Sequence, residues 1–123
     1  MKQDSRLLGA WGEAQTAAFL RQKGYSIRAA NYRTRQGEID LIAESEGMLV
    51  FVEVKTRRST TFAQPMEHVT PHKLKRMQLA ALAYLAETNC DWPARFDVAE
   101  VIAPELLTQP PKAIHYLENV AAF

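Results

Sequence analysis

Two apolar runs, Gly37-Glu38-Ile39-Asp40-Leu41-Ile42-Ala43 and Leu49-Val50-Phe51-Val52-Glu53-Val54-Lys55, decide how this chain of 123 residues folds. Each run has the length and β-branched composition of a strand, and the polar segment Glu44-Ser45-Glu46-Gly47 between them is typical of a hairpin loop. The carboxylates of Asp40 and Glu53 stand inside these runs, where ionisable side chains are least expected. The sequence therefore predicts a β-hairpin with charged groups within its strands.

Side-chain alternation gives the faces of this predicted hairpin. Glu53 and Lys55 are two residues apart and therefore share one face of the second strand. On the first strand, Asp40 is expected on one face and its neighbours Ile39 and Leu41 together on the other. The charged side chains are thus expected to gather on the same side of the hairpin.

Loop length sets the register of the two strands. A loop of two residues at Glu46-Gly47, or of four residues centred there, places Asp40 directly across from Glu53. A loop of three residues would separate them. Two facing carboxylates repel each other and destabilise a sheet, so a hard divalent cation between them is one explanation. A solvated outer face with alternating charges, common in antiparallel sheets, is the other.

Length, composition and charge indicate one domain that spans residues 1–123. No apolar run approaches membrane-spanning length and the N-terminus lacks a signal-peptide core, so we expect no membrane association. The single Cys90 has no disulfide or zinc partner in the sequence, which predicts a reduced, cytoplasmic setting. Residues 1–76 carry 13 basic and 8 acidic side chains, and residues 77–123 carry 2 and 6. A polyanion is therefore expected to bind through one face.

A first helix is predicted from Leu7 to Lys23, with Asp4 or Ser5 as its N-cap and Gly24 as its stop. Glu13 falls on the apolar stripe of this helix, where a carboxylate needs a partner. An arginine of the next strand would make a structural ion pair. The other explanation is that Glu13 is a third acid reaching toward the acids of the hairpin.

Basic residues precede and follow the hairpin. Residues 21–35 hold five basic side chains, no acids and two tyrosines, a composition that suits phosphate and base contacts as well as a solvated, aggregation-resistant edge. A first strand is predicted at residues 25–32. Residues 56–69 form a long predicted loop that opens with Arg57 and Arg58 and holds Phe62 as a wedge or a loop anchor.

A second helix begins with Thr70 as N-cap and Pro71 at its first position. Its predicted apolar stripe comprises Leu74, Met77, Ala81, Leu82 and Leu85. His72, Lys73, Lys75 and Arg76 crowd its first turns, the unfavourable end of the helix dipole for positive charge. Bound phosphate would relieve this conflict, and extension of the side chains into water would also explain it.

Two further strands complete the predicted sheet. Residues 95–102 should pair in parallel with the strand of Glu53, because a helix separates them, and residues 113–120 form an edge strand. Asp97 is expected to be a structural partner of an arginine. The resulting class is α/β: a mixed sheet of about five strands flanked by two main helices, in the order α-β-β-β-α-β-β.

This order, together with Gly37-Glu38-Ile39-Asp40 and Glu53-Val54-Lys55, looks like the PD-(D/E)xK, restriction-endonuclease-like nuclease core. More closely, the chain resembles the YraN family of small bacterial predicted endonucleases, which is similar to the archaeal Holliday-junction resolvases. The resemblance covers nearly the whole chain, including Trp11-Gly12-Glu13 and Arg95-Phe96-Asp97-Val98. Ile39 stands where the superfamily motif has proline. Resolvase-like branches of the superfamily often lack this proline too.

The resemblance implies a Mg²⁺- or Mn²⁺-dependent endonuclease that hydrolyses DNA phosphodiester bonds, with branched or junction DNA as a candidate substrate. Asp40, Glu53 and the carbonyl of Val54 would hold the metal, with Glu13 completing the site directly or through water. Lys55 would position the attacking water and stabilise charge. The expected nucleic-acid contacts are Arg33, Arg35, Arg57, Arg58, Lys73 and Arg76. Cutting both strands of a junction would require a homodimer.

A second interpretation is a non-catalytic nucleic-acid-binding or partner-docking module that retains the nuclease fold. The modest net charge of +1 is compatible with it.

Overall fold

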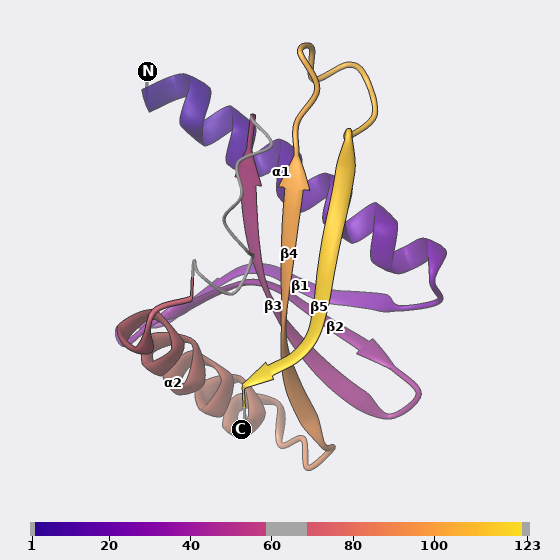
Figure 1. Cartoon of the computed structure of the whole chain (residues 1–123). Helices are drawn as coiled ribbons and strands as arrows, with labels where there is room; N and C mark the ends of the chain where they lie inside the picture. Colours follow the sequence, from indigo (N-terminus) through magenta and orange to yellow (C-terminus); the bar gives the residue numbers. More distant parts are fainter. Residues whose placement is uncertain (1, 59–68, 122–123) are drawn as a thin grey trace.

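The computed structural model describes residues 2–58 and 69–121, which form one five-stranded mixed sheet with two helices (Figure 1). The elements are α1 (Lys2–Gln22), β1 (Ser26–Arg33), β2 (Glu38–Ser45), β3 (Met48–Arg57), α2 (Pro71–Thr88), β4 (Ala94–Ile102) and β5 (Ala113–Ala121). The strand order is β1-β2-β3-β4-β5, with β3 and β4 parallel and the other neighbours antiparallel. The predicted α/β class, element order, parallel crossover and edge strand β5 are confirmed. The prediction for Phe62 lies outside the described residues.

The β2–β3 hairpin has a two-residue loop, the shorter of the two even loops considered from the sequence. Glu46 and Gly47 both have positive φ angles, 51° and 78°, as the tight hairpin turn of a right-twisted strand pair requires. Ser45 therefore pairs with Met48, and the backbone register continues to Leu41 and Val52. The pairing stops one step short of Asp40 and Glu53, so the two strands separate where these acids lie.

Two apolar clusters cover the two sides of the sheet. On β3, Phe51 packs with α2 residues such as Met77, whereas Val50 and Val52 pack with α1 residues such as Leu20. This division follows from strand alternation, because both faces of a central strand must be buried when a helix covers each face. Figure 1 shows α1 crossing behind the strands, and α2 lying beside the start of β2, away from the β2–β3 turn. Glu53 and Lys55 follow the clustered residues Phe51 and Val52 along β3.

The alternation predicted for β2 is wrong beside Asp40. Ile39 packs in the α2-side cluster and Leu41 in the α1-side cluster, although residues two apart are expected on one face. Asn31, opposite Asp40 in the register of the flanking pairs, has a φ of 54°, so β1 is irregular at the same level. Regular pleating is thus interrupted on both strands at the position of Asp40.

Helix α2 is fixed close to the start of β2. Its N-cap is Thr70, whose Oγ1 accepts the Lys73 N–H at 3.1 Å, as the sequence predicts. Gly37 is buried against the helix, and a Cβ atom at this position would lie 1.9 Å from the Arg76 carbonyl oxygen. Because only glycine fits there, Gly37 allows the first turns of α2 to approach the hairpin.

Three element predictions need correction. Helix α1 begins at Lys2 rather than Leu7, so Asp4 and Ser5 are helical residues and not caps. Strand β3 continues to Arg57, because it pairs with β4 as far as Ile102. On α2, Leu82 is 54% exposed, because the helix buries Ala80 and Tyr84 instead of the predicted position.

Asp97 is a structural residue, as predicted. It is fully buried, and its carboxylate accepts hydrogen bonds from Arg95 Nε at 3.0 Å, from the Tyr116 hydroxyl at 2.6 Å and from the Asn119 N–H at 2.9 Å. Burial, together with the Asp97 carboxylate, raises the pKa of Tyr116. This network joins β4 to β5 away from the hairpin acids.

Candidate functional site

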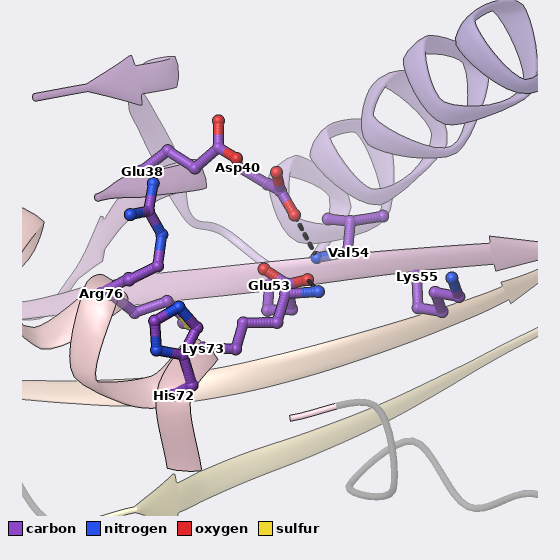
Figure 2. A pocket seen from close by; sticks show the side chains of 9 residues that line it. Glu38, Asp40, Glu53, Val54, Lys55, His72, Lys73 and Arg76 are labelled. Carbon is purple, nitrogen blue, oxygen red and sulfur yellow. Dashed lines mark hydrogen bonds and ion pairs between the residues drawn. The ribbon is translucent and has the colours of Figure 1, made fainter. Parts of the chain in front are cut away.

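A cavity of about 460 Å³ opens where β2 and β3 separate in front of the N-terminal turns of α2 (Figure 2). It is lined by Glu38, Asp40, Glu53, Val54, Lys55, His72, Lys73, Arg76 and Met77. Seven of these nine side chains are acidic or basic, and the exceptions are Val54 and Met77. Acids from the strands therefore face bases from the helix. The cavity therefore joins the two groups of residues that the sequence singled out.

Asp40 turns its side chain toward β3. Its Oδ2 accepts the backbone N–H of Val54 at 2.8 Å, across the gap left by the end of the strand pairing (Figure 2). The carboxylate thereby satisfies a donor that a regular ladder would have paired with a carbonyl. This bond fixes the orientation of the Asp40 carboxylate in the lining of the cavity.

Glu53 is buried in the floor of the cavity and forms an ion pair with Lys73 of α2. Burial, followed by the charge of Asp40, raises the pKa of Glu53 to about 7, and the Lys73 ammonium opposes this rise. Burial also raises the pKa of Asp40, against the opposing effects of the Val54 N–H and of Glu53. A hydrogen bond between the two carboxyl groups lowers the pKa of Asp40 and raises that of Glu53, which makes Glu53 the donor of the pair.

Glu13 lies beside this pair but outside the cavity lining. It lines a neighbouring cavity of about 250 Å³ with Val54, Lys55 and other residues. Burial and then the charge of Asp40 raise the pKa of Glu13, while a hydrogen bond with Asn31 and the charge of Arg33 lower it. The structure contains elements of both alternatives for Glu13. The charge of Asp40 affects it, as expected for a third acid, and Asn31 and Arg33 of β1 stabilise its ionised form, as expected for a structural role.

Lys55 lines the cavity two residues beyond Glu53 and is exposed. Figure 2 shows its ammonium apart from the Asp40–Glu53 pair. It also lines the neighbouring cavity that contains Glu13, so it stands between the two cavities.

The six predicted nucleic-acid contacts are divided by the fold. Lys73 and Arg76 line the cavity. Arg33 forms an ion pair with Glu38 at 3.2 Å, and Arg57 forms one with the buried Glu100 at 2.7 Å. The remaining two, Arg35 and Arg58, are exposed and lie outside the cavity lining.

Comparison with known proteins places the chain in a family. The sequence profile of the uncharacterised protein family UPF0102 matches residues 12–101, which include Glu13, Asp40, Glu53, Lys55 and Lys73. The chain belongs to UPF0102. This is the YraN family that the hairpin motifs indicate, so the resemblance is confirmed.

Relatives in UPF0102 match over most of their length. A UPF0102 protein of Syntrophomonas wolfei is 47% identical over 102 residues, which cover 82% of this chain and 89% of the relative. A UPF0102 protein of Symbiobacterium thermophilum is 51% identical over 98 residues, covering 79% and 83%. One of Alkaliphilus metalliredigens is 42% identical over 116 residues, covering 94% and 97%. The shared name states a family and no activity.

The oxygen donors of the cavity fit a hard cation. No group of three or more His, Cys, Asp or Glu side chains within residues 2–58 and 69–121 is gathered closely enough to hold a metal ion together. Asp40 and Glu53 nevertheless supply two adjacent carboxylates, and Mg²⁺ is commonly bound by one or two carboxylates with water completing its shell. Their raised pKa values show that positive charge at this point would stabilise both ionised forms. Among the same described residues, no helix has the length and apolar character needed to cross a membrane.

Three residues have contacts at the site that the sequence does not indicate. Lys73, a predicted phosphate contact, also forms an ion pair with Glu53. Asn31 hydrogen-bonds Glu13 from a left-handed conformation, which asparagine adopts more readily than most residues. Gly37 gives α2 room to approach β2, and a glycine that immediately precedes a strand was the available signal.

Proposed function

We propose that this protein is a metal-dependent endonuclease that hydrolyses phosphodiester bonds of DNA. The proposal rests mainly on the Asp40–Glu53 pair, two adjacent carboxyl groups in a cavity bordered by basic side chains. Burial raises the pKa of both groups, and the charge of Asp40 raises that of Glu53 further. Such an arrangement costs stability unless a ligand uses it, and perturbed acids in a cleft are typical of functional sites. The single cysteine supports action in the reducing cytoplasm.

Asp40 and Glu53 would hold Mg²⁺ or Mn²⁺, with the carbonyl of Val54 as a further oxygen donor. The bound ion supplies a Lewis acid and a water of lowered pKa. The bond from the Val54 N–H keeps the Asp40 carboxylate oriented. Lys55, at the junction of the two cavities, would orient the attacking water and stabilise charge on the phosphate, and Glu13 would hold a second water on the other side of β3.

The basic side chains beside the acids would hold the DNA backbone. Lys73 and Arg76 line the cavity, so a phosphate that enters it meets positive charge from α2. Contacts of this kind give salt-dependent binding with little sequence preference. Branched DNA is the substrate we propose to test first, because the family resemblance is to junction resolvases.

The test is cleavage of branched and linear DNA with Mg²⁺ or Mn²⁺. Wild type should cut, whereas Asp40→Asn and Glu53→Gln, which keep the side-chain shapes, should lose activity to background. Glu46→Gln, in the exposed hairpin turn, is the matched control and should cut like wild type. Equal cutting by all four proteins would contradict the proposal, because a contaminating nuclease would then be the simpler explanation.

A non-catalytic nucleic-acid-binding module is the second candidate. The observation in its favour is the Lys73–Glu53 ion pair, which satisfies Glu53 from within the chain. Calorimetric titration with Mg²⁺ and Mn²⁺ separates the two candidates. Absence of binding at millimolar metal, in a protein that still binds DNA, would favour the module.

Cutting both strands of a junction requires two active sites, so the nuclease proposal includes a homodimer on that substrate. Light scattering with and without junction DNA measures this directly. A mass of one chain per junction under cleaving conditions would exclude paired incision by a dimer.

A further inference from the structure

Lys73 is fixed at its backbone and adjustable at its side chain. Its N–H is bonded to Thr70 Oγ1 at 3.1 Å in the first turn of α2, so the residue cannot move without loss of the N-cap. Its side chain is 41% exposed, although the ammonium pairs with Glu53. A lysine of this kind changes partner by rotating its stem, with no movement of the helix.

The partner of Lys73 is far more buried than Lys73 itself. The Glu53 side chain is 8% exposed and has the Asp40 carboxyl as a neighbour, so it needs a nearby positive charge in order to ionise. A divalent cation between the two acids would provide that charge more effectively than one ammonium group. It would also repel the ammonium from the position it now occupies.

The acids near Lys73 all come from the strands, since Glu38, Asp40 and Glu53 line the same cavity. The first turn of α2 has no acidic residue, and the helix N-terminus itself repels cations. His72 and Arg76 are the cavity-lining side chains nearest in sequence, and Figure 2 shows both on the same helical turns. An ammonium that a divalent cation displaces from Asp40 and Glu53 lies near His72 and Arg76, and an anion such as a phosphate that enters the cavity would attract it.

We propose that Lys73 is an exchangeable counter-ion, which neutralises Glu53 in the metal-free protein and transfers to a DNA phosphate when a divalent cation binds the acids. The inference rests on the proposed metal site and DNA-binding function. The exchange makes metal binding and DNA binding cooperative. The metal ion releases Lys73 from Glu53 to bind a phosphate, and a phosphate that binds Lys73 frees Glu53 to bind the metal. By linkage, DNA then raises metal affinity by the same factor as metal raises DNA affinity.

The salt dependence of DNA binding tests this exchange. Fluorescence anisotropy would follow binding of a labelled junction DNA at several KCl concentrations, at one mildly alkaline pH, with either EDTA or a fixed concentration of Ca²⁺. Calcium takes the place of the catalytic ion so that the DNA stays intact. The proteins are wild type, Lys73→Met, Lys73→Gln and the control Lys75→Met, an exposed lysine of the same helix outside the cavity lining.

With Ca²⁺, Lys73→Met and Lys73→Gln should have a slope of log affinity against log salt that is smaller than wild type by about 0.9, the value for one lost phosphate contact. With EDTA their slopes should equal that of wild type. Lys75→Met should change the slope equally, or not at all, in both conditions. A reduction of similar size with EDTA, or no reduction with Ca²⁺, would overturn the exchange.

Calorimetry with Ca²⁺ in the absence of DNA supplies an independent measurement. Both Lys73 variants should bind Ca²⁺ several-fold more tightly than wild type, because a competing cation has been removed. Weaker binding than wild type would overturn the inference and leave the metal site intact. If wild type binds no Ca²⁺, Mg²⁺ or Mn²⁺, the metal site of the proposed function fails as well, so the two failures are distinguishable.

Discussion

The carboxylate of Asp40 replaces a backbone carbonyl of a paired strand, since its Oδ2 accepts the Val54 N–H of β3 at 2.8 Å. The bond has a structural function that is separable from charge. Asparagine retains an oxygen that accepts the same N–H, whereas alanine leaves this N–H without its partner.

We expect Asp40→Ala to lower the free energy of unfolding by about 1 kcal/mol, because the part-buried Val54 N–H loses its hydrogen-bond acceptor. Asp40→Asn should be clearly more stable than Asp40→Ala, because it keeps the bond and removes one of two repelling carboxyl groups. Urea denaturation of the metal-free proteins measures both values. Equal stability of the two variants would show that the Val54 bond contributes nothing.

Stability of the metal-free protein should fall as pH rises from about 5 to above 7. Glu53 titrates near 4.5 in an unfolded chain and at about 7 in the folded protein, chiefly because it is buried and secondly because Asp40 is close. Between these values the folded state holds a proton that the unfolded state has released, so rising pH favours unfolding. The stabilising contribution of this proton is complete below the unfolded value and is lost as pH rises through the folded value.

Glu53→Gln tests the origin of this dependence. Urea midpoints in EDTA at several pH values should vary less in this variant than in wild type over the same interval. Glu46→Gln, in the hairpin turn, should behave like wild type. If Glu53→Gln kept the full pH dependence, another group would be responsible.

The hairpin could be predicted because its signals are local. Two apolar runs of strand length, a glycine at the turn and an even loop fix the register from residue 41 to residue 52 without reference to the rest of the chain. The proximity of Asp40 and Glu53 follows from this register. Their detailed geometry does not, because the strands separate one pair earlier and Ile39 packs on the side opposite Leu41.

The Lys73–Glu53 ion pair could not be predicted from pattern alone. The two residues are 20 positions apart and meet only because α2 packs closely against β2. That approach depends on tertiary packing at Gly37, which no periodicity in the sequence encodes. Helix caps, by contrast, depend on neighbouring residues, so Thr70 was identified correctly.

Gly37→Ala should therefore disturb the site and the fold together. The new Cβ would meet the Arg76 carbonyl oxygen at 1.9 Å, a contact with backbone that cannot be relieved by a side-chain rotation. We expect a loss of stability of roughly 1–3 kcal/mol, as for other overpacked sites. Gly9→Ala is the matched control, because a Cβ there meets nothing within 4 Å inside α1.

Gly9→Ala should stabilise the protein by about 0.5–1 kcal/mol, since alanine is the better helix former. In urea denaturation, the free energy of unfolding should therefore fall in Gly37→Ala and rise in Gly9→Ala. A Gly37→Ala protein as stable as wild type would contradict the close packing of α2 against β2.

The buried pair of Arg57 and Glu100 should respond differently to single and double substitution. Their side chains are 13% and 5% exposed, and Arg57 Nε lies 2.7 Å from Glu100 Oε2, so Arg57→Met removes a cation that pairs with this buried carboxylate. Loss of one partner of such a pair typically costs about 3–5 kcal/mol, whereas replacing both by apolar groups is often close to neutral. Arg58→Met, at the exposed neighbouring position, should change stability by less than about 0.5 kcal/mol.

The double variant Arg57→Met/Glu100→Met should accordingly be more stable than Arg57→Met, as measured by urea denaturation. The same proteins test whether Arg57 contacts DNA, because the double variant separates loss of the arginine from loss of the fold. If the folded double variant binds DNA like wild type, Arg57 acts only through Glu100. If its affinity falls while Arg58→Met binds normally, Arg57 contacts the backbone in addition to its structural pairing.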